Sequence, residues 1–462
     1  MAESEKIEHD SVDLQTDTKQ HIEDAAIATD KEHQLTLREA LKAYPKAISW
    51  SVLLSTAVVM EGYDTILIGS FLASPSFVNT FHNTGSAADD TLTITAPWQS
   101  AVANGAYIGE ILGLAATGIL CDRFGNKAVM TGATVLMIAF IFISFFGETL
   151  ALQLAGQILC GIPWGAYQTI TTVYASEVLP VALRVVKHGK IEQAKTAVSR
   201  LQAAHPRAQI PNPDETVALL LKTDAIEQEL TSSSSYLECF RGANLRRTEI
   251  ATLTWTTQQM CGPVLQTFAT YLFVQAGLAS TQAFNMTLGL YAIAFVGTIL
   301  SWPLIANFGR RTIFLSGLGG IFVSLMVVGF LGIPGPENSS ASWAAGAFLL
   351  IFTFIYDSTV GPLTYVIVPE VSSSRLRHKT TVIAGNMYNV TCIWTGVLTP
   401  YMLNNTAWNW GSYVGFFWAG MTALCFVWAY FRLPETKCLT YAELDELFQA
   451  KVPARQFGKS RM

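Results

Sequence analysis

Charged residues are scarce in this chain of 462 residues, where they make up 14% of the total. Average soluble domains carry about 25%. Hydrophobic residues make up 51% and include sustained apolar runs. Runs of about 20 residues match the roughly 30 Å hydrocarbon core of a bilayer. The alternative is a soluble protein with buried helices, but such helices are usually shorter. The composition therefore predicts an all-α membrane protein.

Several other features are missing from the sequence. The seven cysteines are scattered and form no CxxC pair, so neither a disulfide framework nor a metal site is expected. We find no histidine cluster, no nucleophile–base pair and no phosphate-binding loop, so an enzyme is not expected and no cofactor is implied. Residues 1–46 contain no apolar signal-peptide region, which predicts a cytosolic tail.

The apolar runs number ten and divide into four and six around one long hydrophilic segment. We expect membrane spans near 48–72, 97–120, 128–147, 151–173, 250–275, 286–305, 312–333, 344–368, 380–403 and 411–431. The predicted organisation is a cytosolic tail (1–46), an incomplete four-span bundle (47–174), a cytosolic linker with helical segments (175–248), a six-helix bundle (249–432) and a cytosolic tail (433–462).

The basic residues test this topology. With both ends placed in the cytosol, all 29 Lys and Arg fall in the tails, the linker and the loops on the inner side. The outer loops and the spans then contain none. Such a bias towards the cytosolic side is the positive-inside rule. It excludes the opposite orientation.

Three acidic residues lie within the first two spans. Glu61 and Asp64 are three residues apart and share one helix face, and Glu110 lies in the second span. Charged groups inside a membrane are costly and usually functional. Since the spans hold no Lys or Arg to pair with them, these carboxyl groups would tend to keep their protons. We predict a proton-coupling site; the alternatives are neutral hydrogen-bonding groups, or a carboxylate solvated near the outer surface.

Motifs at the inner ends of the helices occur twice. Gly118-Ile-Leu-Cys-Asp122-Arg123-Phe-Gly125-Asn-Lys127 is echoed by Asn307-Phe-Gly309-Arg310-Arg311. Glu177 is followed seven residues later by Arg184, and Glu370 by Arg377. Two halves with matching inner loops indicate a transporter built from a repeat. Gly125 would permit the tight turn of the first motif.

These motifs resemble those of the major facilitator superfamily. Together with the ending Pro434-Glu-Thr-Lys437, they resemble its sugar porters, and Glu61-Gly-Tyr-Asp64 resembles the fungal α-glucoside proton symporters. The resemblance implies a cytoplasmic gate that closes the inner face, although simple solvation of helix ends is the alternative. The expected gate residues are Asp122, Arg123, Glu177, Arg184, Arg310, Glu370 and Arg377.

The resemblance also implies a sugar site. Adjacent amides such as those of Gln258 and Gln259 offer donors and acceptors that suit sugar hydroxyl groups. They can instead bond only to neighbouring helices. The expected substrate-binding residues are Gln258, Gln259, Tyr365, Asn386 and Asn389. Asp357 is a further carboxylate without an obvious partner.

One part of the family pattern is absent. The motif ending at Arg184 leads in the family into spans five and six, but here Val185 begins what resembles the cytosolic linker. About 60 residues, enough for two spans, are therefore missing. Gln157 also stands where many proton-coupled members have arginine. The loss of partner cations would favour a facilitator.

The sequence thus predicts a plasma-membrane carrier that takes up an α-glucoside such as maltose with protons, by alternating access. Its expected partners are a small sugar, protons and the lipid bilayer, with no nucleic acid, and it is expected to be monomeric. The alternatives are a truncated relative that is inert or acts as a sugar sensor, and a monosaccharide uniporter. Sequons at Asn338 and Asn404 lie in predicted outer loops.

Overall fold

The computed structural model describes residues 45–84, 92–176, 236–275, 277–334, 338–373, 376–437, 439 and 441–457. The chain divides into two compact units, one made of Met1–Met60 and Tyr167–Ser234, the other of Glu61–Ala166 and Ser235–Met462. In the first unit the described residues are the beginning of one helix and the end of another.

Apart from an isolated bridge between Thr84 and Thr93, the regular structure of the described residues is helical. The amino-terminal helices are α3 (Pro45–Phe71), α4 (Pro75–Phe81), α5 (Ala96–Phe124), α6 (Asn126–Phe145) and α7 (Leu150–Ser176). The carboxy-terminal part has η1 (Tyr236–Phe240), α11 (Gly242–Met260), α12 (Val264–Thr267), α13 (Ala269–Gln275), α14 (Ser280–Asn307), α15 (Arg310–Leu331), α16 (Ser339–Ser358), α17 (Val360–Val371), α18 (Arg377–Leu403), η2 (Gly411–Tyr413), α19 (Val414–Arg432), α20 (Tyr441–Gln449) and η3 (Ala454–Gln456).

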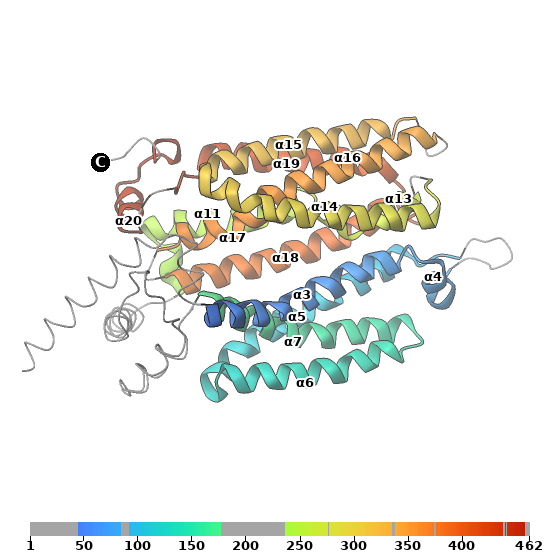
Figure 1. Cartoon of the computed structure of the whole chain (residues 1–462), viewed down its shortest axis with the longest axis horizontal. Coiled ribbons are helices and arrows are strands. Elements are labelled where there is room, and N and C mark those ends of the chain that lie inside the picture. Colours follow the sequence, from blue (N-terminus) through green and yellow to red (C-terminus); the bar gives the residue numbers. More distant parts are fainter. Residues whose placement is uncertain are drawn as a thin grey trace, which may run out of the picture. The chain divides into compact units, whose positions relative to one another are not determined.

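Each of the ten predicted spans falls on a helix or on a short series of helices (Figure 1). The all-α prediction is therefore confirmed. By length and composition, α6, α14, α15, the α16–α17 pair and the segment that contains α19 can cross a membrane. α11 and α18 are not among these five, because threonine and amide side chains interrupt their apolar sequence. They are the helices that carry the predicted sugar site.

The helices of the carboxy-terminal part pack as a layered bundle. α15 lies against α16 and α19, α14 lies against α16, and α11 lies against α17 and α18 (Figure 1). Their shared core contains large side chains such as Phe314, Phe352 and Trp418. Their burial and mutual packing hold the helices that carry the polar groups of the site in fixed register.

Small residues allow two amino-terminal helices to approach closely. α5 carries Gly105, Gly109 and Gly113 at four-residue intervals; Gly109 lies against Gly161 of α7 and Gly113 against Gly165. A Cβ atom on Gly165 would lie only 2.5 Å from the backbone nitrogen of Leu114 in α5. Such small residues let helix backbones approach closely inside membranes. This crossing positions the middle of α5.

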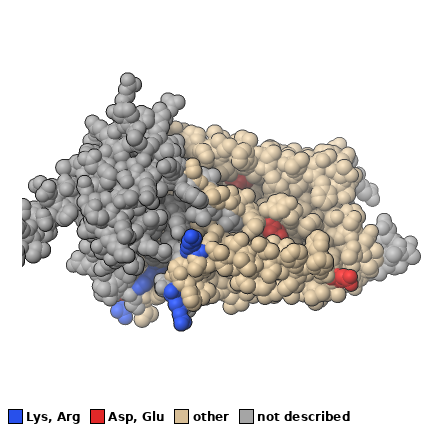
Figure 2. All heavy atoms as spheres, turned by 60° about the horizontal axis from the view of Figure 1, so that its bottom comes forward, with Lys and Arg blue, Asp and Glu red and all other residues tan. Residues whose placement is uncertain are grey.

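The turn between α5 and α6 is made by Gly125, which has a φ angle of +78°. This conformation is readily available to glycine and costly for residues with a Cβ atom. The predicted role of Gly125 is therefore confirmed. Figure 2 shows one face of the molecule, on which the visible Lys and Arg side chains gather at one end.

Candidate functional site

Two of the spans are broken at the level of the candidate site. The fifth predicted span, near 250–275, is interrupted at Gly262, which has a φ angle of +99° and is followed by Pro263. The eighth predicted span, near 344–368, is interrupted at Thr359, between α16 and α17. The side-chain nitrogen of Gln258 donates to the carbonyl oxygen of Gly361 at 3.0 Å and so connects the two breaks. Broken helices of this kind typically surround the substrate site of a transporter.

The amide groups near these breaks are largely buried. The nitrogen of Gln259 lies 3.1 Å from the Tyr388 hydroxyl and 2.9 Å from the Cys392 sulfur. Among the described residues, the side-chain oxygen of Gln258 and both polar atoms of the Asn389 amide have no hydrogen-bond partner. A buried polar group left unpaired costs about 1–3 kcal/mol. These atoms are therefore suited to receive hydroxyl groups of a ligand.

Aromatic side chains border the same amides. The ring of Trp255 lies 5.7 Å from the ring of Tyr365, edge to face, and 5.8 Å from that of Tyr388. Its indole nitrogen is buried and has no partner among the described residues. Tyr365 is exposed, and so is Asn386, which lies one helical turn before Asn389 on α18. The structure thus brings most of the predicted sugar-binding residues together on α11, α17 and α18.

The amino-terminal part reaches this cluster through α5. Glu110 is 2% exposed and lies close enough to Cys392 of α18 to affect it electrostatically. A Cβ atom on Gly161 would come within 2.9 Å of the backbone nitrogen of Glu110, so α7 covers this position closely. One predicted coupling residue therefore lies next to the amide cluster.

The other acidic residues lie in different surroundings. Asp64 is half-buried and is hydrogen-bonded by Gln157, the residue that stands where an arginine was expected. The backbone of Glu61 belongs to α3, but its side chain lies outside the described residues. For Asp357 the expectation was wrong, because the side-chain nitrogen of Gln266 donates to its carboxylate at 3.3 Å. Gln266 follows the break in the fifth predicted span, and this contact could not be deduced from sequence spacing.

A polar network joins the ends of α15 and α17 to the carboxy-terminal segment. Arg310 pairs with Glu370 at 3.0 Å, and the Thr436 hydroxyl donates to the other oxygen of Glu370 at 2.6 Å. The carboxylate of Glu435 accepts from the backbone nitrogens of Arg310 and Arg311 at 2.8 and 3.2 Å. It thereby satisfies free N–H groups at the start of α15, where the helix dipole also favours a negative charge.

The remaining gate residues are described only in part. Arg123 is exposed and lies over the ring of Phe124. Two residues, Asp122 and Arg377, have side chains outside the described part of the chain, and Glu177 and Arg184 lie wholly outside it. The predicted pairs of these four residues are therefore not tested.

The contacts of two equivalent helices differ. α5 is the second span of its half and packs against α18, the fifth span of the other half. In a molecule built from two similar halves, α14 should pack in the same way against a fifth span of the first half. Among the described residues, the main contacts of α14 are with α13, α15, α16 and α17, all from its own half. Its Leu288, Phe295 and Trp302 side chains are 72%, 69% and 68% exposed.

Solved structures define the class of this protein. The chain matches the proton:xylose symporter XylE bound to 6-bromo-6-deoxy-D-glucose with a TM-score of 0.64, at 17% identity, over 87% of this chain and 99% of that one. It matches inward-open XylE from E. coli with a TM-score of 0.58, at 16% identity, over the same shares. The fold is that of the major facilitator superfamily, and the chain is a multi-pass membrane protein.

Sequence comparison narrows this class. The family described as "Sugar (and other) transporter" matches residues 50–187 and 185–448. A general alpha-glucoside permease of Saccharomyces cerevisiae is 34% identical over 502 residues, which cover 95% of this chain and 81% of the permease. The maltose permease MAL61 of Saccharomyces cerevisiae is 32% identical over 511 residues, with shares of 96% and 82%. The chain belongs to this sugar transporter family.

The same comparisons bear on the junction at Arg184 and Val185. The family match consists of two segments that meet at residues 185–187. The region aligned with the general alpha-glucoside permease, at 502 residues, is longer than the whole chain of 462 residues. That permease therefore contains residues that have no counterpart here.

Proposed function

We propose that this chain is built to carry an α-glucoside such as maltose across the plasma membrane together with protons, by alternating access, with both termini in the cytosol. The observation that carries this proposal is the cluster of amides and aromatic rings at the two broken helices. Gln258, Gln259 and Asn389 present donors and acceptors, and Trp255 and Tyr365 present apolar ring surfaces. Relatives named α-glucoside and maltose permeases support the substrate class.

Coupling to protons would depend on the carboxyl groups of α3 and α5. Glu110 lies beside the amide cluster, so a change in its charge would be felt by groups that bind sugar. Asp64 is hydrogen-bonded by a neutral amide from Gln157 rather than by a guanidinium group. We propose Glu61, Asp64 and Glu110 as the coupling residues, with Glu110 the best placed of the three.

The inner gate would include the pair of Arg310 and Glu370, which joins α15 to α17. Thr436 and Glu435 extend the pair to the carboxy-terminal segment. A network of polar contacts at helix ends can hold one state of a carrier and must rearrange when the other state forms. We propose that Asp122, Arg123, Glu177, Arg184 and Arg377 complete this gate.

A second candidate function is that of a relative that does not transport. The exposed apolar face of α14 and the family match in two segments both favour it. Without spans five and six, one side of the amino-terminal bundle would face lipid. Polar groups that face hydrocarbon without partners cost several kcal/mol each. Such a chain would be inert or would bind sugar without moving it.

Uptake of labelled maltose distinguishes the two functions. The chain is expressed in yeast cells that lack their own maltose carriers, and uptake is measured with and without a proton uncoupler. Uptake that the uncoupler abolishes supports the symporter, and uptake that it leaves unchanged supports a facilitator. Replacing Gln259 by alanine should reduce uptake at least tenfold, because it removes a buried hydrogen-bonding group from the site. Asn285→Ala on α14, where the side chain is exposed, is the matched control.

A second version of the chain tests the missing spans. It carries, between Arg184 and Val185, the segment that the general alpha-glucoside permease has at this position. If only the extended version transports maltose, the chain as it stands is the non-transporting relative. If both versions fail while both reach the plasma membrane in folded form, the proposed substrate is wrong.

A further inference from the structure

A pocket lies at the inner end of the carboxy-terminal helices, separate from the Arg310–Glu370 network. Its volume is about 380 Å³. Three segments that are distant in sequence form it: the first turn of α11, the end of α19, and the stretch from α20 to η3. It is lined by Gly242, Ala243, Arg246, Phe431, Arg432, Phe448, Lys451, Pro453 and Ala454.

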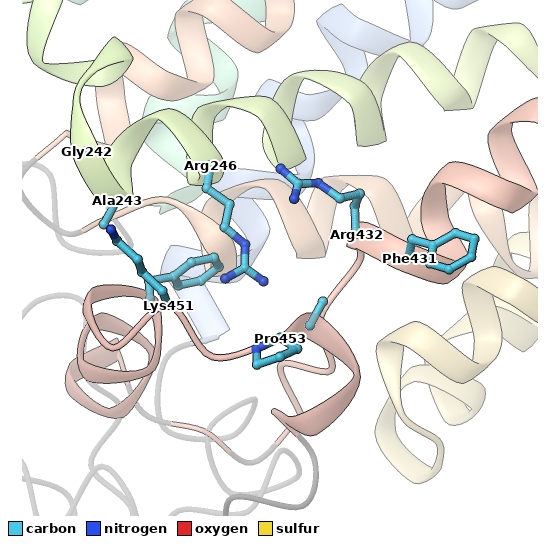
Figure 3. A pocket seen from close by; sticks show the side chains of 9 residues that line it. Gly242, Ala243, Arg246, Phe431, Arg432, Lys451 and Pro453 are labelled. Atoms are coloured by element: carbon cyan, nitrogen blue, oxygen red, sulfur yellow. The ribbon is translucent and has the colours of Figure 1, made fainter.

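The charged side chains of this pocket are mainly basic. Figure 3 shows Arg246 projecting from α11 into the space between the two other segments, with Lys451 to one side and Arg432 to the other. Arg432 is neutralised by a two-point contact with the Glu249 carboxylate. The lining contains no carboxylate to balance Arg246 and Lys451. The pocket therefore has an excess of positive charge.

Arg246 is held in place by groups that do not neutralise it. Its guanidinium group donates to the carbonyl oxygen of Val452 at 2.7 Å and lies 5.4 Å from the ring of Phe448 and 5.7 Å from that of Phe457. Its side-chain Nε is buried and has no partner among the described residues. Burial, followed by the nearby charge of Arg432, lowers the pKa of Arg246 from its ordinary value. The group nevertheless stays protonated near neutral pH.

We propose that this pocket binds a phosphate group, either the headgroup of an anionic phospholipid in the inner leaflet or a soluble phosphate. A fixed guanidinium group with free N–H donors, flanked by a lysine, is well suited to phosphate oxygens. The position fits a lipid, because Arg246 precedes the fifth predicted span and Arg432 is the last residue of α19, which forms the tenth. Basic groups at this level attract anionic headgroups. Bound phosphate would fasten the carboxy-terminal segment to α11.

This site does not depend on the proposed sugar function. None of its lining residues belongs to the amide cluster or to the gate network. The segment from α20 to η3 packs against α11 through Arg246, Val452 and the phenylalanine rings. That contact places Phe448 within 4.4 Å of the Arg247 guanidinium as well.

Binding is tested on the purified full-length protein with soluble probes. Short-chain phosphatidylserine, short-chain phosphatidylcholine and inorganic phosphate are each titrated, and their dissociation constants are measured by calorimetry. Binding of phosphatidylserine but not of inorganic phosphate assigns the site to a lipid headgroup. Binding of both at similar strength assigns it to the phosphate group alone. Failure of both to bind, or equally strong binding of the zwitterionic phosphatidylcholine, overturns the proposal.

Variants assign the binding to this pocket. Lys451 is exposed and has a φ angle of +55°, a conformation that asparagine adopts more easily than most residues, so Lys451→Asn should fold normally. We expect it to weaken binding about fivefold, and Lys451→Arg to preserve binding. Arg246→Ala should weaken binding more, but it also loses the contacts to the phenylalanine rings. Arg241→Ala removes an exposed charge from the same end of α11 outside the pocket and should change little. Equal effects of Arg241→Ala and Lys451→Asn would indicate general charge attraction and refute a specific site.

Discussion

The crossing of α5 and α7 predicts that Gly165→Ala destabilises the protein. The added Cβ atom would lie 2.5 Å from the backbone nitrogen of Leu114 and 2.6 Å from the carbonyl oxygen of Glu110. Ordinary van der Waals contact begins at 3.4 Å. Because both atoms belong to the backbone of α5, no side chain can turn aside, and the two helices must separate. Overpacking of this kind costs about 1–3 kcal/mol.

The matched control is Gly132→Ala on α6, where an added Cβ atom would meet nothing within 4 Å. Both substitutions gain the same helix propensity, about 0.8–1.0 kcal/mol in soluble peptides. Their difference therefore isolates the packing cost. Thermal unfolding of the purified protein in detergent, followed by tryptophan fluorescence, measures it. We expect Gly165→Ala to unfold several degrees below Gly132→Ala.

The result that would refute this reasoning is equal unfolding temperatures for the two variants. The helices would then not cross at the distance that the structure shows. A consequence for the site follows as well, because the same crossing covers Glu110. A separation of α5 from α7 should expose this carboxyl group. Its labelling by a hydrophobic carbodiimide in membranes should therefore change in Gly165→Ala and stay constant in Gly132→Ala.

Three further outcomes are expected. Glu370→Gln should lower the unfolding temperature by a few degrees, since it leaves a partly buried arginine without its carboxylate. The same change at an exposed glutamate of α20 should leave the unfolding temperature unchanged. Mass spectrometry of the secretory-pathway product should find no glycan on Asn404, which is 1% exposed and hydrogen-bonded, while the exposed Asn338 is the accessible sequon. Gln157→Arg should reduce carbodiimide labelling of Asp64, because a neighbouring cation favours the charged carboxylate. Unchanged labelling would mean that residue 157 and Asp64 do not interact.

The sequence predicted the helices well, because length and apolar composition alone determine where a chain can cross a bilayer. It was less informative about where they begin. α11 starts at Gly242, whereas the bundle was expected from residue 249. The extra turns carry Arg246 and Arg247 and extend beyond the apolar run. Hydropathy does not detect a helix that continues into water.

Contacts between distant segments could not be predicted in the same way. Glu370 pairs with Arg310, which lies sixty positions away in the chain, a partner that no sequence spacing indicated. Its expected pair with Arg377 is not tested, because the Arg377 side chain lies outside the described residues. Trp255 was not singled out among the eleven tryptophans of the sequence. Only its position beside Tyr365 and Tyr388 distinguishes it. Sequence motifs identified the helix ends at which Arg310 and Glu370 lie. The packing of the helices determined that these two side chains meet.

The predicted absence of spans five and six would not be visible in the charge pattern. Removing two consecutive spans leaves every later loop on its original side of the membrane, so the positive-inside pattern is unchanged. Contacts between the halves do change, because each half should contribute one second span and one fifth span to the interface. Here α5 has its partner in α18, whereas α14 presents exposed Leu288, Phe295 and Trp302. This asymmetry, and not the charge pattern, is the structural observation that favours the proposed non-transporting relative.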